Sequence, residues 1–244
     1  MEPAEYEAMH AQELRHWWFR GRRRVLIDAL RTVVISRSSS PQILDYGCGT
    51  GGNSPAYAQL GSVVGVEPDP TAVRLAFQRG WARYCRGAGT ELPFKDAVFD
   101  VVMASDVLEH IQNDVAAAGE IARVLRPGGT AIITVPAHPW LFSEHDAALH
   151  HCRRYSKTSF RDLLDSSGMK IRRISYWNTA LFPVICVHRL LTTSQTLKKP
   201  RSDTTSSPRI INEALTGLLL AEAAVLRYAP LPWGVSLLAV AERV

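Results

Sequence analysis

Apolar and polar positions alternate in blocks along most of the chain. Short apolar runs are typical of buried strands, whereas apolar residues repeating about every three or four positions are typical of amphipathic helices. Strands are expected at 43–46, 63–66, 82–86, 101–104, 130–135, 169–176 and 235–241. Helices are expected between them at 56–60, 71–79, 114–125 and 159–166. This alternation predicts an α/β fold with a mainly parallel sheet and right-handed crossovers.

The first 31 residues predict one further helix, because apolar side chains recur on one face. Within it, residues 16–26 place aromatic side chains among arginines. One interpretation is a lid with an anion-binding arm, in which Trp18, Arg20 and Arg24 contact substrate. The alternative is a docked helix with a solvated basic face.

The interval 177–233 is far longer than a turn requires. Residues 179–191 are apolar but too short to span a bilayer. Residues 198–209 are polar, breaker-rich and expected to be mobile, and 210–228 predict a second helix. This insertion suits a lid, the lining for an apolar substrate, or a homodimer face. A role at a membrane interface is a weaker alternative, because the basic residues form no continuous face.

We therefore expect one domain over residues 1–244, long enough to bury a sizeable core. Its expected parts are a helical N-terminal lid at 1–35, a core at 40–176, a helical insertion at 177–233 and a last strand at 234–244.

Composition narrows the class of protein only a little. Hydrophobic residues make up 46% and charged residues 21%, which is ordinary for a globular protein. The net charge of +5 favours an anionic ligand or surface without identifying one. The four cysteines form no C-x-x-C pair and the N-terminus has no apolar run, so a cytoplasmic protein without stable membrane insertion is expected.

A glycine-rich stretch, ILDYGCGTGG at 43–52, organises the chain. An apolar strand runs to Asp45, and four glycines follow, so that a ligand can lie against bare backbone at the start of a helix. The order is an acid before G-x-G-x-G, unlike the G-x-G-x-x-G of dinucleotide-binding proteins. Glu67 ends the next apolar strand, 20 residues beyond Gly47, where an acid can bind the two hydroxyls of a ribose.

The segment 87–111 makes the prediction more specific. It contains L-P-F at 92–94, F-D at 99–100 and D-V-L-E-H at 106–110, and L-R-P-G-G follows at 125–129. With the glycine turn, these motifs resemble class I S-adenosylmethionine-dependent methyltransferases of the small-molecule type (methyltransferase type 11/12-like). The resemblance implies a Rossmann-like three-layer sandwich. Its seven-stranded sheet is mainly parallel with an antiparallel last strand, and helical lid elements come from the N-terminal and C-terminal parts.

The resemblance also implies S-adenosyl-L-methionine as methyl donor and S-adenosyl-L-homocysteine as product. The residues expected to bind this cofactor follow the predicted strands: Asp45, Gly47, Cys48, Gly49, Gly51, Glu67, Pro68, Ala88, Gly89, Ser105, Asp106, Val107 and His110. One position departs from the family. Its Asp, which commonly holds the adenine amino group, aligns with Ala88. Adenine is therefore expected to be held by backbone, by Thr90 or by a neighbour.

The segment 136–155, after the fifth predicted strand, should border the methyl acceptor, because ligands of open α/β sheets bind beyond the carboxyl ends of the strands. It carries an unusual density of polar residues, including four histidines considered as a catalytic base: His138, His145, His150 and His151. Related sequences often carry an H-D…H-x-R-R-Y pattern, which the chain matches at His145, Asp146, His151, Arg153, Arg154 and Tyr155.

Three interpretations of this segment compete. A histidine acts as general base, or Arg153, Arg154 and Tyr155 bind an anionic substrate, or Asp146, His150 and Arg154 pair to hold the loop. No metal is expected, because no H-E-x-x-H-like spacing occurs.

The function predicted is methyl transfer by in-line displacement to a small-molecule acceptor of apolar or anionic character. One alternative is methylation of a lipid-linked or sugar intermediate at a membrane surface. A second is a non-catalytic S-adenosylmethionine-binding regulatory protein. A nucleic-acid substrate is not expected, because the chain has no Asn/Asp-Pro-Pro-Tyr/Phe-like motif and no separate recognition domain.

Overall fold

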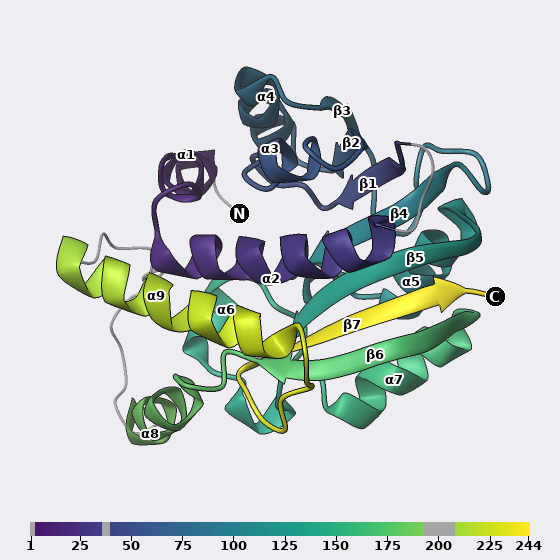
Figure 1. Cartoon of the computed structure of the whole chain (residues 1–244). Helices are drawn as coiled ribbons and strands as arrows, with labels where there is room; N and C mark the ends of the chain where they lie inside the picture. Colours follow the sequence, from purple (N-terminus) through teal and green to yellow (C-terminus); the bar gives the residue numbers. More distant parts are fainter. Residues whose placement is uncertain (1–2, 36–39, 193–207) are drawn as a thin grey trace.

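A seven-stranded sheet forms the centre of the molecule (Figure 1). The computed structural model describes residues 3–35, 40–192 and 208–244. The strands are β1 (Gln42–Tyr46), β2 (Ser62–Glu67), β3 (Arg83–Arg86), β4 (Phe99–Ser105), β5 (Leu125–Pro136), β6 (Met169–Trp177) and β7 (Ser236–Arg243). Their order is β3-β2-β1-β4-β5-β7-β6. β7 is antiparallel to both β5 and β6, whereas β1 to β5 pair in parallel, which confirms the predicted sheet.

Helices cover both faces of the sheet, which gives the three layers. The helices are α1 (Pro3–Gln12), α2 (Trp17–Val34), α3 (Ser54–Tyr57), α4 (Pro70–Arg79), α5 (Asp114–Val124), α6 (Glu144–Ala148), α7 (Lys157–Ser166), α8 (Phe182–Thr192) and α9 (Arg209–Leu226), with 3₁₀ turns η1 (Leu108–His110) and η2 (Pro139–Leu141). In Figure 1, α2 and α9 lie in front of the sheet, and α5 and α7 behind it.

Alternate side chains of the central strands divide the core into two parts. In β4, Val102 packs on the α5 and α7 side, and Val101 and Met103 pack on the α2 and α9 side. All three are fully buried. This follows from the two-residue repeat of a strand covered on both faces, which is why these strands are nearly continuous apolar runs.

Helix α2 is a structural layer of the core. Its Leu26 and Leu30 are fully buried against the sheet. α9, from the long insertion, packs alongside α2, and the contact needs Gly21, since a Cβ there would lie 2.3 Å from Cδ1 of Leu219. The N-terminal stretch and the insertion therefore support each other.

Some element boundaries differ from those predicted. The N-terminal helix breaks at residues 13–16, where His16 caps α2 by accepting from the Trp18 N–H. This break sends α1 across to α4. β5 begins at Leu125, before its glycines, because Leu125 pairs with Phe99 ahead of a register shift. The predicted mobile stretch 198–209 lies almost wholly outside the described residues.

None of the described helices combines the length and the apolar character needed to cross a bilayer.

Candidate functional site

The glycine turn after β1 approaches its neighbours more closely than side chains would allow. Three of its glycines have φ between +53° and +75°: Gly47, Gly49 and Gly51. Such angles are costly for other residues. A Cβ on Gly47 would lie 2.5 Å from Cγ2 of Val107, just before η1. The N–H groups of Gly47 and Cys48 donate to the Val66 carbonyl, which joins the turn to β2. The turn is thus bare backbone in a fixed position.

Glu67, the last residue of β2, is bonded to the same turn. Its Oε2 accepts from the Gly49 N–H at 3.1 Å, and its Oε1 accepts from the Asp69 N–H at 3.3 Å. Burial raises the pKa of Glu67, and the two hydrogen bonds oppose that shift. The arrangement places a carboxylate beside the turn, where it can accept hydrogen bonds from ribose hydroxyls.

Asp45 lies beneath the turn and is 2% exposed. Ser54 Oγ, at the start of α3, donates to its Oδ2 at 3.1 Å. Burial raises the pKa of Asp45 to about 7, despite the Ser54 hydrogen bond. In the structure this carboxyl therefore contacts Ser54, just after the glycine turn.

The N-terminal region closes over the turn through residues that the sequence analysis missed. Glu13, just after α1, is buried and accepts a short hydrogen bond from Thr50 Oγ1. Arg79 of α4 bonds Glu13 Oε2 at 2.9 Å and the Thr50 carbonyl at 2.7 Å. No local sequence pattern signals this group, because its members are separated by more than twenty residues.

Arg22 of α2 is a second missed residue. Its Nη1 lies 2.6 Å from Oδ2 of Asp106, at the carboxyl end of β4. Burial lowers the pKa of Arg22, but the contact with Asp106 outweighs it and raises the value overall. Thr134 Oγ1 donates to the other carboxylate oxygen of Asp106 at 3.0 Å. α2 therefore places a cation at the centre of the candidate site.

The region where adenine is expected is made largely of backbone. Ala88 is exposed and forms an isolated bridge with Glu91. Tyr46 OH donates to the Gly89 carbonyl at 2.8 Å, and a Cβ on Gly89 would collide with Tyr46 and Ile111. A carboxylate from position 88 is absent, as the sequence indicates.

The remaining predicted cofactor residues surround these groups. Cys48 is buried, Pro68 is exposed after β2, and Ser105 is half-buried at the end of β4. His110 lies in η1, and its ring is 4.7 Å from the ring of His151. The predicted cofactor residues thus follow the carboxyl ends of β1, β2, β3 and β4, and their roles stay predictions.

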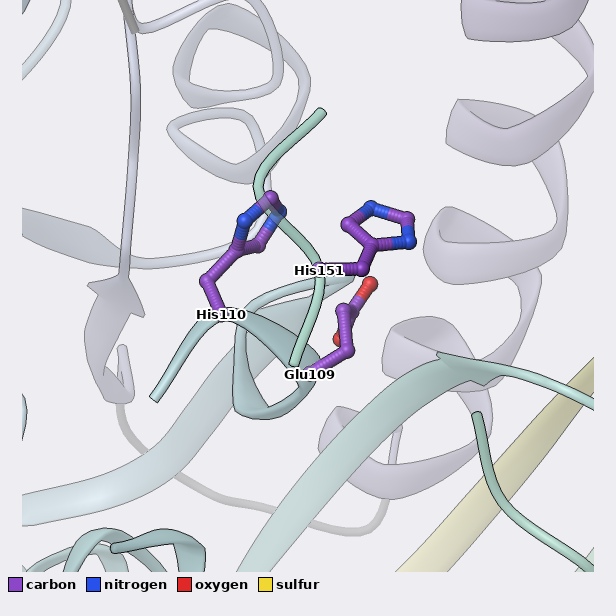
Figure 2. Close-up of side chains that lie close together, drawn as sticks. All are labelled: Glu109, His110 and His151. Carbon is purple, nitrogen blue, oxygen red and sulfur yellow. The ribbon is translucent and has the colours of Figure 1, made fainter. Parts of the chain in front are cut away.

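A compact group of three side chains lies next to Asp106. Glu109 and His110 come from η1, and His151 comes from the loop after α6 (Figure 2). One potential ligand atom from each lies within 4.8 Å of the other two. Burial, followed by the charge of Asp106, raises the pKa of Glu109 well above its ordinary value.

Asp146 of α6 is the centre of the polar loop 136–155. It is fully buried, and its carboxylate contacts Nε of Arg154 at 2.7 Å, Nδ1 of His151 at 3.1 Å and Nη1 of Arg189 at 2.9 Å. Burial would raise the pKa of Asp146, but the hydrogen bonds from His151 and Arg154 hold it well below its usual range. The predicted Asp146–Arg154 pair is present, and His151 takes the place expected of His150.

The other histidines of the loop are dispersed. His138 Nε2 lies 3.0 Å from the Gly234 carbonyl, and its ring stacks on Tyr176. His145 is half-buried on α6, and His150 is exposed with a φ of +58°. The structure therefore brings only His151 to the cluster with Glu109 and His110, and the choice of a catalytic base stays a prediction.

The residues predicted to bind substrate make contacts within the chain. Arg153 Nη1 and Tyr155 OH both contact the carboxylate of Asp114, at 2.7 and 2.8 Å. Arg153 is partly accessible, whereas Arg154 and Tyr155 are buried.

On α2, the three predicted substrate contacts point to other partners. Trp18 stacks on Trp177 at 4.9 Å. Arg20 pairs with Glu213 of α9, and Arg24 with Asp28 one turn further along α2. Their substrate roles are untested predictions, and the contacts show that each also has a structural partner.

Comparison with known proteins points to one class. Residues 44–133 match the model of a methyltransferase domain. An uncharacterized methyltransferase of Mycobacterium sp. (strain JLS) is 40% identical over 112 residues, which cover 45% of this chain and 44% of that protein. One from Mycolicibacterium gilvum is 34% identical over 128 residues, covering 51% and 50%. The matches thus span about half the length of these relatives.

Solved structures agree on the fold. Phosphoethanolamine N-methyltransferase 2 of Haemonchus contortus, in complex with S-adenosyl-L-methionine, gives a TM-score of 0.59 at 17% identity and covers 88% of this chain and 51% of that one. The [4+2]-cyclase SpnF gives 0.59 at 19% identity and covers 89% and 80%. At such identity the likeness shows the fold alone, and these two proteins are named for different reactions.

The family match over residues 44–133, the relatives and the fold together support the resemblance to class I S-adenosylmethionine-dependent methyltransferases with a Rossmann-like sheet. The resemblance stated from the motifs is confirmed.

Proposed function

We propose that this chain binds S-adenosyl-L-methionine and transfers its methyl group to a small-molecule acceptor of apolar or anionic character. The pairing of the glycine turn with Glu67 carries the proposal. N–H donors and a carboxylate meet there beside β1, which has β2 on one side and β4 on the other. Ligands of open α/β sheets bind at such a switch in strand order.

Methyl transfer demands alignment more than side-chain chemistry. A lone pair of the acceptor attacks the methyl carbon as the carbon–sulfur bond breaks, which leaves S-adenosyl-L-homocysteine, and the acceptor's proton passes to a base or to water. The sulfonium is already activated, so holding acceptor, carbon and sulfur in line supplies much of the acceleration. A dedicated histidine base is therefore not required by the chemistry.

Arg153 is the better candidate of the two loop arginines for an anionic acceptor. Its partner Asp114 is shared with Tyr155, and its side chain is 29% exposed, so an incoming anion can compete for it. Arg154 is 4% exposed and held by the buried Asp146. Exchanging that partner would break a buried ion pair with Asp146, which is costly in the interior.

A lipid-linked acceptor is the second candidate, favoured by apolar side chains exposed on α8 and α9. Val184 and Val187 are 66% and 57% exposed, and Ile210 is 85% exposed. Exposed apolar surface of this kind suits contact with an amphiphile. Sedimentation with anionic vesicles supports this candidate if the protein is retained and Val184→Ser releases it. Equal sedimentation of both proteins removes it.

Calorimetry with S-adenosyl-L-methionine and S-adenosyl-L-homocysteine tests the first step. Glu67→Ala should lower the affinity for both molecules by about tenfold or more, since a hydrogen bond to a charged group contributes about 1.5–3 kcal/mol. Glu242→Ala is the matched control, because this partly exposed acid on β7 pairs with Arg172 of the edge strand β6, away from β1 and β2. Absence of binding by the wild-type protein would reject the proposal.

Turnover separates the enzyme from a non-catalytic cofactor-binding protein. The protein is incubated with methyl-labelled donor and a native cell extract, and the labelled product is identified by mass. A labelled small molecule is expected. Tight binding of the donor without transfer to any component would favour the regulatory alternative.

A further inference from the structure

Glu109 is a fully buried acid without a hydrogen-bond partner. Neither of its carboxylate oxygens is bonded to any group in the described part of the chain. Buried carboxylates normally accept several hydrogen bonds or bind a cation, because leaving the oxygens unpaired costs free energy. Its carboxylate points toward His151 in Figure 2. The site therefore has an unused anionic ligand directed into it.

Two imidazoles stand beside this carboxylate. The ring of His110 lies edge-on to that of His151, with centroids 4.7 Å apart. Nδ1 of His151 is bonded to Asp146, so its Nε2 is the nitrogen left to coordinate. A carboxylate behind a metal-binding histidine fixes its tautomer and orientation. Asp146 is in the position to do this.

Backbone contacts hold the two segments of the cluster together. Cys152 N–H donates to the Glu109 carbonyl at 2.7 Å, and the Cys152 thiol lies 3.6 Å from the His110 carbonyl. His151 N–H donates to the Asp146 carbonyl at 2.9 Å. The three side chains are thus presented from anchored backbone, although they come from parts of the sequence some forty residues apart.

A divalent cation fits this group chemically, because it stabilises an ionised carboxylate and binds neutral imidazoles.

We propose that Glu109, His110 and His151 bind one divalent transition-metal cation of the Zn²⁺ type. Two imidazole nitrogens and one carboxylate oxygen are a donor set found in zinc sites that keep a position open. The sequence analysis expects no metal because it finds no ligand spacing typical of a single helix. These ligands instead come from two segments, η1 and the loop after α6. Ligand atoms of one tetrahedral ion lie about 3.4 Å apart. The atoms here lie within 4.8 Å of one another, so any pair near that limit must move together on binding.

The open position suggests what the ion does. Resting on the proposed function, an oxygen of the acceptor binds at the open position, and a hydroxyl bound there passes its proton to water more readily before its oxygen attacks the methyl carbon. This assigns hydroxyl-bearing acceptors as the substrate class. The cluster adjoins Asp106 and Val107 in the motif 106–110, at the carboxyl end of β4, on the side where the donor is expected.

Calorimetry with ZnCl₂ alone, on chelator-treated protein, tests the site without any cofactor. One ion per chain is expected. Glu109→Gln and His110→Ala should each weaken the affinity by about tenfold or more, the range seen when ligand support is removed. His150→Asn is the matched control: it removes the neighbouring imidazole, which lies outside the cluster, and Asn tolerates the φ of +58°. Its affinity should match the wild type.

A second measurement keeps the test independent of heat signals. Co²⁺ should give intense visible absorption bands in the wild type and in His150→Asn, and weak bands in Glu109→Gln. Circular dichroism confirms that each variant is folded. No stoichiometric binding by the wild type, or equal affinity in all four proteins, would overturn the metal site.

A parallel titration with S-adenosyl-L-methionine separates this proposal from the preceding one. Donor binding without any Zn²⁺ binding leaves the proposed function intact and rejects the metal site. Zn²⁺ binding without donor binding supports the metal site and rejects the proposed function.

Discussion

The two sides of the candidate site are built from different groups: the expected donor side lies at the glycine turn, and the expected acceptor side is the loop 136–155. Around the glycine turn, contacts are made by backbone groups, with Glu67 bonded to two N–H groups. In the loop 136–155, the contacts are between charged side chains that converge on Asp146. The turn presents bare backbone beneath the N-terminal region. Much of the polar chemistry of the loop, in contrast, is engaged in holding the loop.

This difference shows that a high density of polar residues in a loop is not a reliable sign of a ligand site. Histidines and arginines are concentrated in the loop, which predicts a substrate site there. Arg154 and His151, however, both bond Asp146 within the loop. Buried charges need partners, so a polar loop packed on a core uses many of its own groups internally. The turn has few functional side chains, and its geometry is the more informative sign of a ligand.

Loss of the Asp146 carboxylate should have the largest effect. Asp146→Ala leaves Arg154 and Arg189 without that buried anion, and removing one member of a buried ion pair typically costs about 3–5 kcal/mol. Urea unfolding measures the change. Asp162→Ala, at an exposed acid on α7, is the control and should differ from wild type by less than about 0.5 kcal/mol. Similar losses in both variants would contradict the role of Asp146.

A side chain on the glycine turn should come next. Gly47→Ala forces a Cβ against Val107 at a φ of +68°, and overpacking typically costs about 1–3 kcal/mol. Donor affinity should fall with stability, because the turn must move. Gly217→Ala on α9, where a Cβ meets nothing within 4 Å, is the control and should be neutral or stabilising. Unchanged donor binding in Gly47→Ala would show that the turn does not approach the ligand.

The buried Asp45 predicts a pH dependence. Its pKa is raised from 3.8 to about 7 by burial, so between these values the folded protein binds more protons than the unfolded chain. Stability contributed by protonated Asp45 is therefore full below about pH 4 and decreases as pH rises to 7, by at most about 1.4 kcal/mol per unit. Ser54, Glu13, Arg22 and Glu67 act on the same carboxyl.

Asp45→Asn should flatten this pH dependence in the ligand-free protein, as measured by urea unfolding at pH 5, 6 and 7. Glu67 also has a raised pKa and contributes in the same direction, so Asp45→Asn leaves part of the slope. An unchanged slope would show that Asp45 is ionised throughout this range.

Arg153→Ala should have the smallest effect on stability, less than about 1 kcal/mol, because its pair with Asp114 is partly exposed. If Arg153 binds an anionic acceptor, KM for that acceptor should rise while the unfolding midpoint stays near the wild-type value. The adjacent Arg154→Ala should instead unfold far more readily. Equal behaviour of the two variants would remove the distinction drawn between them.

Much of the structure around the glycine turn could be predicted from sequence because its determinants are local. Apolar runs, the acid before the glycines and Glu67 at the end of β2 each follow from strand periodicity and turn geometry over a few residues. The antiparallel β7 came from the family resemblance, because the apolar pattern of a strand does not encode its direction.

Tertiary structure alone decided which polar groups meet. Glu13 reaches Thr50 because the chain breaks between α1 and α2, and Arg22 reaches Asp106 because α2 packs on the sheet. His151, rather than the neighbouring His150, joins Glu109 and His110. Such choices depend on where separate elements dock, since a side chain's partner is set by packing across the core. The sequence therefore determined the fold class and the position of the glycine turn, and packing decided which polar groups meet in the loop 136–155 and at the proposed metal site.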